Sequence, residues 1–197
     1  MRAVLIALLL LPLASLPAQA QEAREPAGEV VVRKSPAEIR AEALDSLFAR
    51  LRKVSSEEEA RIAERAIWQL WMSSDSPTAE LLLKQATEAM NKAALEPSLA
   101  ILDRLVAVHP DFAEAWNKRA TLYFMMGRLD DSLADIDKVL DLEPRHFGAL
   151  SGRGMIYRKE GKLSDALAAF RDALAVNPTM GSVKDAVKEL EKLEQPI

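Results

Sequence analysis

Three prolines place the strongest constraint on this chain, because they recur at one fixed interval. Pro110, Pro144 and Pro178 lie 34 residues apart, and each follows a run that is mostly apolar. Proline lacks the backbone N–H and its ring clashes with the preceding turn, so it marks the point where a helix ends. A constant period of this length predicts a row of equal helical units that stack on one another.

Small residues and glycines repeat in step with the prolines. Ala120 corresponds to Gly154, at a position where two helices are expected to cross and a bulky side chain would separate them. We therefore expect Gly154→Leu to be severely destabilising and Gly148→Ala to be mild. Gly127 and Gly161 are expected to end the first helix of each unit in the left-handed conformation. The other matched pairs are Trp116 with Leu150, Tyr123 with Tyr157, Ser132 with Ala166, Ile136 with Phe170 and Val139 with Ala173.

This order of large, small and aromatic residues resembles the tetratricopeptide-repeat (TPR) family. Residues 113–146 and 147–180 match the pattern over their full length. Residues 79–112 match it less well, because Ala89 replaces the aromatic residue and Ala93 replaces the turn glycine. The chain as a whole resembles small periplasmic TPR proteins of Gram-negative bacteria. The resemblance implies an all-α solenoid in which antiparallel helix pairs stack into a right-handed superhelix.

Helix signals continue on the N-terminal side of the repeats. Ser35-Pro36-Ala37-Glu38 combines an N-cap, a proline at the first helical position and a capping-box glutamate, and Ser56-x-x-Glu59 is a second capping box. These signals predict an N-terminal helical pair over residues 36–75, which we expect to dock on the first repeat. Trp71 is expected in the core, whereas Trp68 fits either the core or an interface.

The two ends of the chain are predicted to lie outside the repeats. A positive start, an apolar run and Ala18-Gln19-Ala20 indicate a secretory signal peptide over residues 1–20. An uncleaved membrane anchor is the alternative, but the run is shorter than a bilayer span and contains Pro12. Residues 21–35 are predicted to be a flexible lead-in and residues 181–197 a capping helix and tail. We therefore expect about nine helices, a periplasmic location and no integral membrane span after cleavage.

Composition and motifs exclude several functions. The chain has no cysteine, which excludes disulfides, a thiolate nucleophile and cysteine-ligated zinc. The chain has a net charge of −4 and therefore lacks the excess of basic residues that is typical of nucleic-acid-binding proteins. It contains no glycine-rich phosphate loop and no common hydrolase motif. The sequence therefore predicts no enzyme activity, no cofactor and no metal, and it predicts the two histidines, His109 and His146, to be surface residues of inter-repeat turns.

The predicted binding surface is the concave face, because the first helix of each TPR unit lines it. Asn117 is expected to contact a peptide backbone, and Arg158 and Lys159 its acidic side chains. Leu83 and Thr87 stand where some TPR domains grip a C-terminal carboxylate, so that clamp is not expected. An ordinary solvated surface is the alternative reading. The predicted groove residues are Leu83, Thr87, Asn117, Thr121, Phe124, Ser151, Met155, Arg158 and Lys159.

Two functions fit these observations. The first is a periplasmic scaffold or adaptor that binds a protein or peptide partner and serves assembly or integrity of the cell envelope. The second is a non-enzymatic carrier whose groove or tryptophan-lined pocket holds a small molecule or a glycan strand. The sequence does not name the partner.

Overall fold

The computed structural model describes residues 34–193, and this part of the chain contains only helices. The predicted all-α class and the helix count are confirmed for these residues. The signal peptide and most of the lead-in lie outside them, as do residues 194–197. The helices are α1 (Pro36–Leu51), α2 (Glu57–Met72), α3 (Pro77–Asn91), α4 (Leu95–Val108), α5 (Ala113–Met125), α6 (Leu129–Leu142), α7 (Phe147–Lys159), α8 (Leu163–Val176) and α9 (Gly181–Leu193).

The first helices begin where the sequence signals predict. The Ser35 side chain accepts the Glu38 N–H, and the Glu38 carboxylate accepts the Ser35 N–H at 2.7 Å, which completes the capping box of α1. Ser56 and Ser76 cap α2 and α3 in the same way, by accepting the N–H of the residue three positions later. Each cap satisfies a backbone donor that the first helical turn leaves unpaired.

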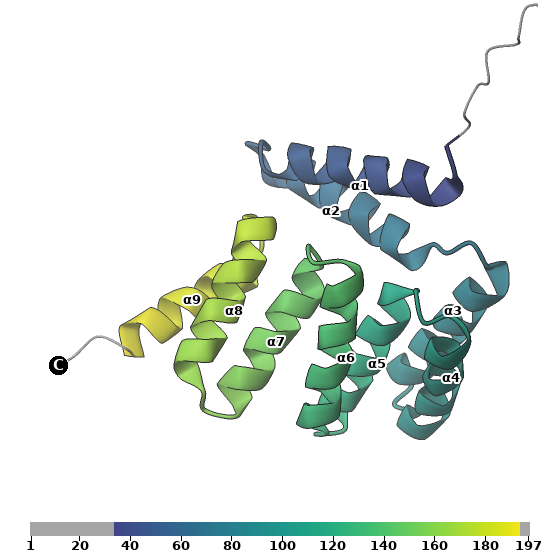
Figure 1. Ribbon diagram of the computed structural model, residues 1–197. Helices are drawn as coiled ribbons and strands as arrows, with labels where there is room; N and C mark the ends of the chain where they lie inside the picture. Colours follow the sequence, from purple (N-terminus) through teal and green to yellow (C-terminus); the bar gives the residue numbers. More distant parts are fainter. Residues whose placement is uncertain (1–33, 194–197) are drawn as a thin grey trace, which may run out of the picture. The chain divides into compact units, whose positions relative to one another are not determined.

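The repeats are three antiparallel helix pairs, α3–α4, α5–α6 and α7–α8, followed by α9 (Figure 1). Small residues lie at the helix crossings, as predicted. Ser132 donates its hydroxyl to the Ala120 carbonyl at 2.7 Å, and Ser98 does the same to Ala86 at 2.9 Å. At the third crossing Gly154 faces Phe170, and an added Cβ would lie 2.6 Å from the Phe170 ring. The backbones therefore approach closely in every pair.

The turns inside the repeats adopt the left-handed conformation. Gly127 and Gly161 have φ angles of +76° and +77°, which confirms their predicted role. The first repeat has Ala93 at the same place, with φ +56°. A non-glycine residue in this conformation costs roughly 1–2 kcal/mol, because its Cβ crowds the backbone. The degenerate repeat therefore carries local strain that the other two avoid.

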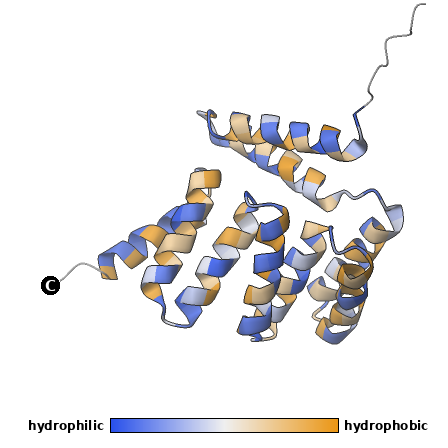
Figure 2. Ribbon diagram, viewed as in Figure 1, coloured by the Kyte–Doolittle hydropathy of each residue, from blue (hydrophilic) through white to orange (hydrophobic). Residues whose placement is uncertain are grey.

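The N-terminal pair, α1 and α2, is docked rather than free, as predicted, but it packs mainly across the turns of the later repeats and not on the first repeat. Its core of leucines and aromatic residues continues into Phe147, and Val176 and Met180 pack against it. Figure 1 shows α1 and α2 over the ends of the repeat helices, and Figure 2 shows their alternation of apolar and polar residues. The reason is that these turns carry large apolar residues that need cover.

Polar contacts between residues that lie far apart in the sequence reinforce this docking. Glu64 of α2 accepts hydrogen bonds from Asn177 at 2.6 Å and from Thr179 at 2.8 Å. Asp45 of α1 pairs with Arg145 at 2.6 Å. The N-terminal pair is thus bound to the turns before α7 and α9. Across residues 34–193, no helix combines the length and the apolar character that a membrane span requires.

Candidate functional site

A depression of about 180 Å³ lies between α5 and α7. Its floor is apolar, with Ile136 and Ile156 at the base, and it exists because small residues on both helices leave the space open. Five of the predicted groove residues line this α5–α7 depression: Asn117, Thr121, Phe124, Ser151 and Met155. The structure therefore gathers these five side chains around one hollow.

The positively charged side chain of Lys159 lies beside the depression. The Lys159 ammonium is 5.0 Å from the centroid of the Phe124 ring, a cation–π contact that holds it near the rim. Arg158 instead faces α9, where its Nη1 lies 3.6 Å from Oε2 of Glu189. The two predicted basic groups thus separate: Lys159 belongs to the depression and Arg158 to the neighbouring helix.

Leu83 and Thr87 do not belong to the depression. Leu83 is buried in the core between α3, α4 and α5, with 1% of its surface exposed, so its predicted groove role is wrong. An apolar side chain at that position packs inward because burial removes its surface from water. Thr87 donates its hydroxyl to the Leu83 carbonyl at 2.8 Å and lines no part of the hollow.

Asn117 lies at the hollow, and one of the two N–H groups of its amide is engaged within the protein. It is 8% exposed, and its Nδ2 donates to Oε2 of Glu114 at 3.0 Å. The amide has a second N–H and the Oδ1 acceptor, so the contact of Asn117 with a peptide backbone stays a prediction. The Thr121 and Ser151 hydroxyls donate to the backbone carbonyls of Asn117 and Gly148. Their oxygens keep acceptor capacity, so these two residues can accept N–H groups from a bound chain.

A buried ionic cluster lies next to the depression, centred on Glu114. Glu114 has 0% of its surface exposed, and its Oε1 lies 3.1 Å from the Lys118 ammonium. Burial raises the pKa of Glu114, but the hydrogen bond with His146 and the charge of Lys118 outweigh it and lower the pKa overall. The carboxylate is therefore ionised at neutral pH.

His146 is the largest departure from the sequence-based expectation, because it is wholly buried rather than exposed in a turn. Its Nε2 lies 3.2 Å from Oε2 of Glu114, and its Nδ1 accepts the Ala149 N–H at 3.1 Å as the cap of α7. Repeat alignment could have indicated this. One period earlier stands Phe112, which is also buried, and one period later stands Met180.

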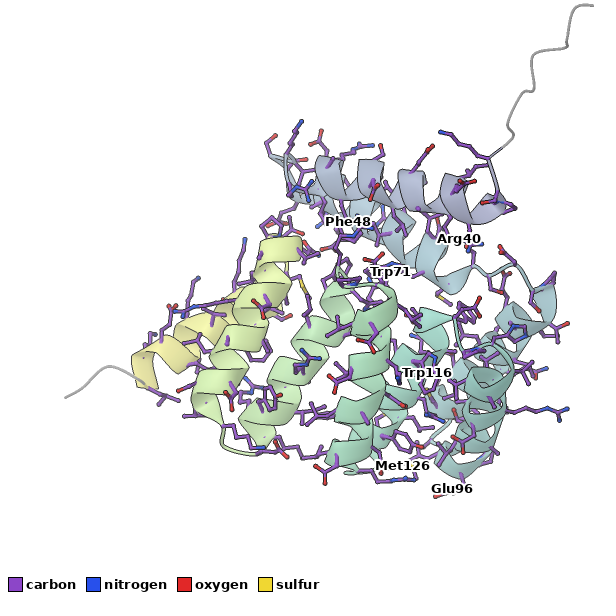
Figure 3. The ribbon with its side chains drawn as sticks, viewed as in Figure 1. Arg40, Phe48, Trp71, Glu96, Trp116 and Met126 are labelled. Carbon is purple, nitrogen blue, oxygen red and sulfur yellow. The ribbon has the colours of Figure 1, made fainter. Side chains whose placement is uncertain are left out.

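Two tryptophans of α2 pack on His146. The Trp71 ring is stacked on the imidazole with centroids 4.0 Å apart and planes 13° apart, and the Trp68 ring meets it edge-on at 5.4 Å. Phe147 contacts both tryptophans. We call Trp68, Trp71, Glu114, His146 and Phe147 the aromatic joint. Figure 3 labels Trp71, which lies where α2 meets the repeat turns.

Gly148 belongs to the same junction, which corrects a second expectation. A Cβ added to Gly148 would lie 2.8 Å from Cη2 of Trp68, so the expected lack of a close contact at Gly148 is wrong, and we now expect Gly148→Ala to destabilise. Trp68 is therefore an interface residue between α2 and α7, one of the two possibilities left open by the sequence. Because Gly148 also lines the depression, α2 lies against one of its walls.

Arg119 is a further residue that the sequence reasoning missed. Its guanidinium makes two hydrogen bonds of 2.8 Å to Asp135 and one of 2.8 Å to Asp103, and it stacks on Trp116 at 4.9 Å. The hydrogen bonds to Asp135 raise its pKa despite the opposing effect of burial. Arg119 therefore ties α4, α5 and α6 together and has a structural role. Residues 34–193 hold no group of three or more His, Asp or Glu side chains placed to bind a metal ion.

Stacked helix pairs with small residues at their crossings define an α-helical repeat protein of the solenoid class. Residues 83–138 and 117–180 match the tetratricopeptide repeat family. The chain is therefore a TPR repeat protein, with a fold that is typically a non-catalytic scaffold. A TPR repeat-containing protein of Rhizobium etli is 34% identical over 76 residues, which is 39% of this chain and 37% of that protein. The match thus spans little more than a third of the relative's length.

Solved structures share the fold at low sequence identity. The first TPR domain of Spaghetti (RPAP3), bound to the HSP90 peptide SRMEEVD, has a TM-score of 0.57 and 17% identity, over 60% of this chain and 94% of that chain. The Yersinia enterocolitica type III secretion chaperone SycD, in complex with a peptide of the translocator YopD, has a TM-score of 0.57 and 13% identity, over 63% and 98%. MamA has a TM-score of 0.55 and 16% identity, over 77% and 82%. At sequence identities this low, the similarity to these structures shows a shared fold and nothing about a shared ligand.

Proposed function

We propose that the protein is a scaffold or adaptor that binds a segment of a partner protein in the α5–α7 depression. The observation that carries this proposal is that Asn117, Thr121, Phe124, Ser151 and Met155, from two successive repeats, line a single hollow. TPR domains typically bind peptides, and the solved structures of the Spaghetti TPR domain and SycD each hold one. Which segment binds here follows from the chemistry of the hollow.

The size and lining of the depression suit one side chain of a peptide. Its volume of about 180 Å³ lies below the roughly 300–1,000 Å³ of small-molecule sites. The floor of Ile136 and Ile156 and the half-exposed Met155 favour an apolar side chain such as leucine or methionine. The Thr121 and Ser151 oxygens accept backbone N–H groups beside that anchor.

The charge at the rim favours an acidic neighbour to the anchor. Lys159 has its contact with Phe124 and is exposed, so it attracts a carboxylate without first breaking an ion pair of the described residues. A rim charge of this kind contributes mostly to association rate and selectivity. Arg158 adds to the same positive field from the side of α9, where Glu189 partly neutralises it.

Export to the periplasm is the second part of the proposal, with a role in cell-envelope assembly or integrity. It rests on the positive start, the apolar run and the Ala-x-Ala site of residues 1–20. The intact mass of the protein recovered from the source cells tests it. A mass that corresponds to a chain beginning at Gln21 supports export with cleavage. A mass that retains residues 1–20 would favour an anchor or a cytoplasmic protein.

Site-specific photocrosslinking tests the peptide-binding proposal. A photoreactive side chain at Met155 should capture a defined partner, and the same group at Lys138, exposed on α6, should not. Gly152→Val fills the hollow, because a Cβ there meets only Ile136 at 3.6 Å, and it should abolish capture at Met155. Gly152→Ala is the matched control with little added volume, and Lys159→Glu should reduce capture. Equal capture at both positions, or capture that survives Gly152→Val, rejects the proposal.

A carrier function remains a second candidate because of a larger cavity at the N-terminal pair. A cavity of about 390 Å³ is lined by Trp71, Phe112 and Leu142 together with polar residues such as Arg40 and Glu143. Its volume falls within the range of small-molecule sites. Native mass spectrometry of the protein purified from its own cells tests it: a bound species that is lost in Leu142→Arg supports a carrier, and its absence favours the scaffold.

A further inference from the structure

The inter-repeat turns place equivalent apolar residues in one row, and the N-terminal pair covers only part of that row. Helices α4, α6 and α8 end at Val108, Leu142 and Val176, which lie 34 residues apart. Val176 packs against the core of α1 and α2, whereas Val108 and Leu142 keep 63% and 43% of their surface exposed. The apolar row that holds the N-terminal pair therefore continues, uncovered, toward the first repeat.

The polar residues that follow these positions show the same difference. Asn177 of the last turn donates to α2 at 2.6 Å. Glu143 of the middle turn binds Arg145, which in turn binds α1. The equivalent residue of the first turn is His109, and its ring forms no hydrogen bond within residues 34–193. The N-terminal pair is thus tied to the two later turns by polar contacts that the first turn lacks.

A cavity of about 390 Å³ takes the place of those contacts at the first turn, and we call it the Phe112 cavity. Trp71 lines it with 6% of its surface exposed, and the Trp71 Nε1 has no hydrogen-bond partner within the described residues. Buried donors are nearly always paired. An oxygen bound in the cavity that Trp71 borders would supply the missing acceptor. The apolar part of the lining is Leu44, Leu70, Trp71, Phe112, Ala113 and Leu142.

The charged part of the lining is acidic. Asp75, Asp111 and Glu143 line the Phe112 cavity with a single guanidinium, that of Arg40 on α1 (Figure 3). Arg40 is already paired with Asp75 at 2.7 Å, and Glu143 is paired with Arg145. Asp111 is exposed and forms no ion pair in the described part of the chain. An uncompensated carboxylate beside an apolar cavity attracts a cation.

We propose that the Phe112 cavity binds a basic segment of a partner protein, with an apolar side chain in the cavity and a lysine or arginine at Asp111. A peptide carbonyl beside the apolar anchor can accept the Trp71 N–H. The α5–α7 depression favours an acidic segment at Lys159, so the two sites select segments of opposite charge. The proposal rests on the Phe112 cavity alone, and it assigns to a peptide the space that the carrier candidate assigns to a small molecule.

The indole N–H resonance of Trp71 tests the proposal with two blocked hexapeptides. Gly-Ser-Leu-Lys-Ser-Gly is the basic probe, and Gly-Ser-Leu-Glu-Ser-Gly is its acidic counterpart. The chain has three tryptophans, so the Trp71 signal is one of three indole signals and is assigned by triple-resonance spectroscopy. The basic peptide at millimolar concentration should move this signal downfield, as a new hydrogen bond does. It should also bind on the order of tenfold more tightly than the acidic peptide.

Matched variants separate the Phe112 cavity from the rest of the surface. Asp111→Lys should remove the preference for the basic peptide, whereas Asp172→Lys, the same charge change at an exposed site on α8, should keep it. Leu142→Arg should abolish the shift, because it places a cation and added volume in the cavity wall. Gly152→Val fills the α5–α7 depression and should leave the shift in place. Failure of this proposal is therefore distinguishable from failure of the peptide site between α5 and α7.

Several outcomes overturn the proposal. They are equal binding of the two peptides, a preference that survives Asp111→Lys, and a Trp71 signal that millimolar basic peptide does not move. Sedimentation velocity and native mass spectrometry examine the other occupants. A dimer that is lost in Leu142→Arg would assign the cavity to a second copy of the chain, and a copurified small molecule that is lost in the same variant would assign it to the carrier function. Either result also overturns the proposal.

Discussion

Helix α7 contains two glycines that meet other helices in two different ways, and the difference separates what the repeat specifies from what this chain adds. Gly154 faces Phe170 of α8 within one repeat, and the corresponding crossings of the other units hold Ala120 and Ala86, whose carbonyls accept the hydroxyls of Ser132 and Ser98. Gly148 faces Trp68 of α2, which lies outside the repeats. The first interface is apolar and closely spaced, whereas the second surrounds a buried charge.

The two interfaces consequently depend on different forces. The helix crossing at Gly154 is stabilised by close apolar packing, which tolerates almost no added volume. The aromatic joint combines stacking of Trp71 on His146 with the buried pair of His146 and Glu114. A buried pair is costly to break because removing one partner leaves the other uncompensated. Mutations at the two sites should therefore differ in size and in pH dependence.

The largest effect is expected at the crossing. Gly154→Leu should lower the free energy of unfolding by about 3 kcal/mol or more, because the side chain would begin 2.6 Å from the Phe170 ring. Chemical denaturation monitored by circular dichroism measures this change. Gly152→Ala on the same helix is the control, because its added Cβ makes only ordinary contact, and it should be neutral or slightly stabilising. Similar midpoints for the two variants would contradict the crossing.

His146→Ala should follow, with a loss of about 3 kcal/mol. The change removes the cap of α7, the stack on Trp71 and one partner of the buried Glu114 carboxylate. The same denaturation experiment compares it with His109→Ala, which should cost below about 1 kcal/mol since His109 is only partly buried. Equal losses for the two histidines would show that the joint adds no special stability.

Glu114 should make the joint sensitive to acid. Its pKa is lowered in the folded protein, so its stabilising contribution is complete above the unfolded value of about 4.3 and is lost as pH falls through the folded value. The free energy of unfolding should therefore fall more steeply below about pH 4.3 in the wild type than in Glu114→Gln. Urea denaturation at a series of pH values gives both slopes, and parallel slopes would refute the assignment.

Gly148→Ala should have an intermediate effect, a loss of about 1–2 kcal/mol. The added methyl group would lie 2.8 Å from the edge of Trp68, and the indole can move only by disturbing its contacts with His146 and Phe147. Combining the change with Trp68→Ala removes the clash, so the double variant should lose less stability than the sum of the two single losses. Additive losses would place the strain elsewhere.

The smallest effect is expected in the degenerate repeat, where a substitution should stabilise. Ala93→Gly relieves the left-handed backbone at φ +56° and should raise the free energy of unfolding by about 1 kcal/mol. Thermal denaturation should show a higher midpoint. The reverse changes at Gly127 and Gly161 provide matched controls and should both destabilise. A lower midpoint for Ala93→Gly would mean that chain entropy outweighs the relief of strain.

The repeats were predictable because the contacts that define them involve residues close in sequence and recur every 34 residues. A small residue at each crossing, a glycine at the turns of the second and third repeats and a proline at each end report the backbone directly. The joint was not predictable from a turn histidine considered alone, because polar turn residues are usually solvated. Only its alignment with the buried Phe112 carried a signal of burial.

The groove was partly predictable for the same reason. The inward positions of α5 and α7 follow the period, and they do meet at one depression. Leu83 occupies the repeat position of Asn117, but its side chain is apolar and therefore packs in the core instead of lining the groove. Arg158 faces away from the depression because Glu189 on α9 attracts it. The departure of Arg158 depends on a neighbour outside the repeat, which a period cannot report.

The bonds from Glu64 to Asn177 and Thr179 change how the whole array should unfold. They join residues 113 and 115 positions apart, whereas a simple solenoid contacts only adjacent units. An open array can fray from either end, one unit at a time. Here the C-terminal repeat cannot separate without also releasing α2, so loss of one end is energetically linked to the other. The added loop closure slows folding relative to an open array but makes the transition more cooperative.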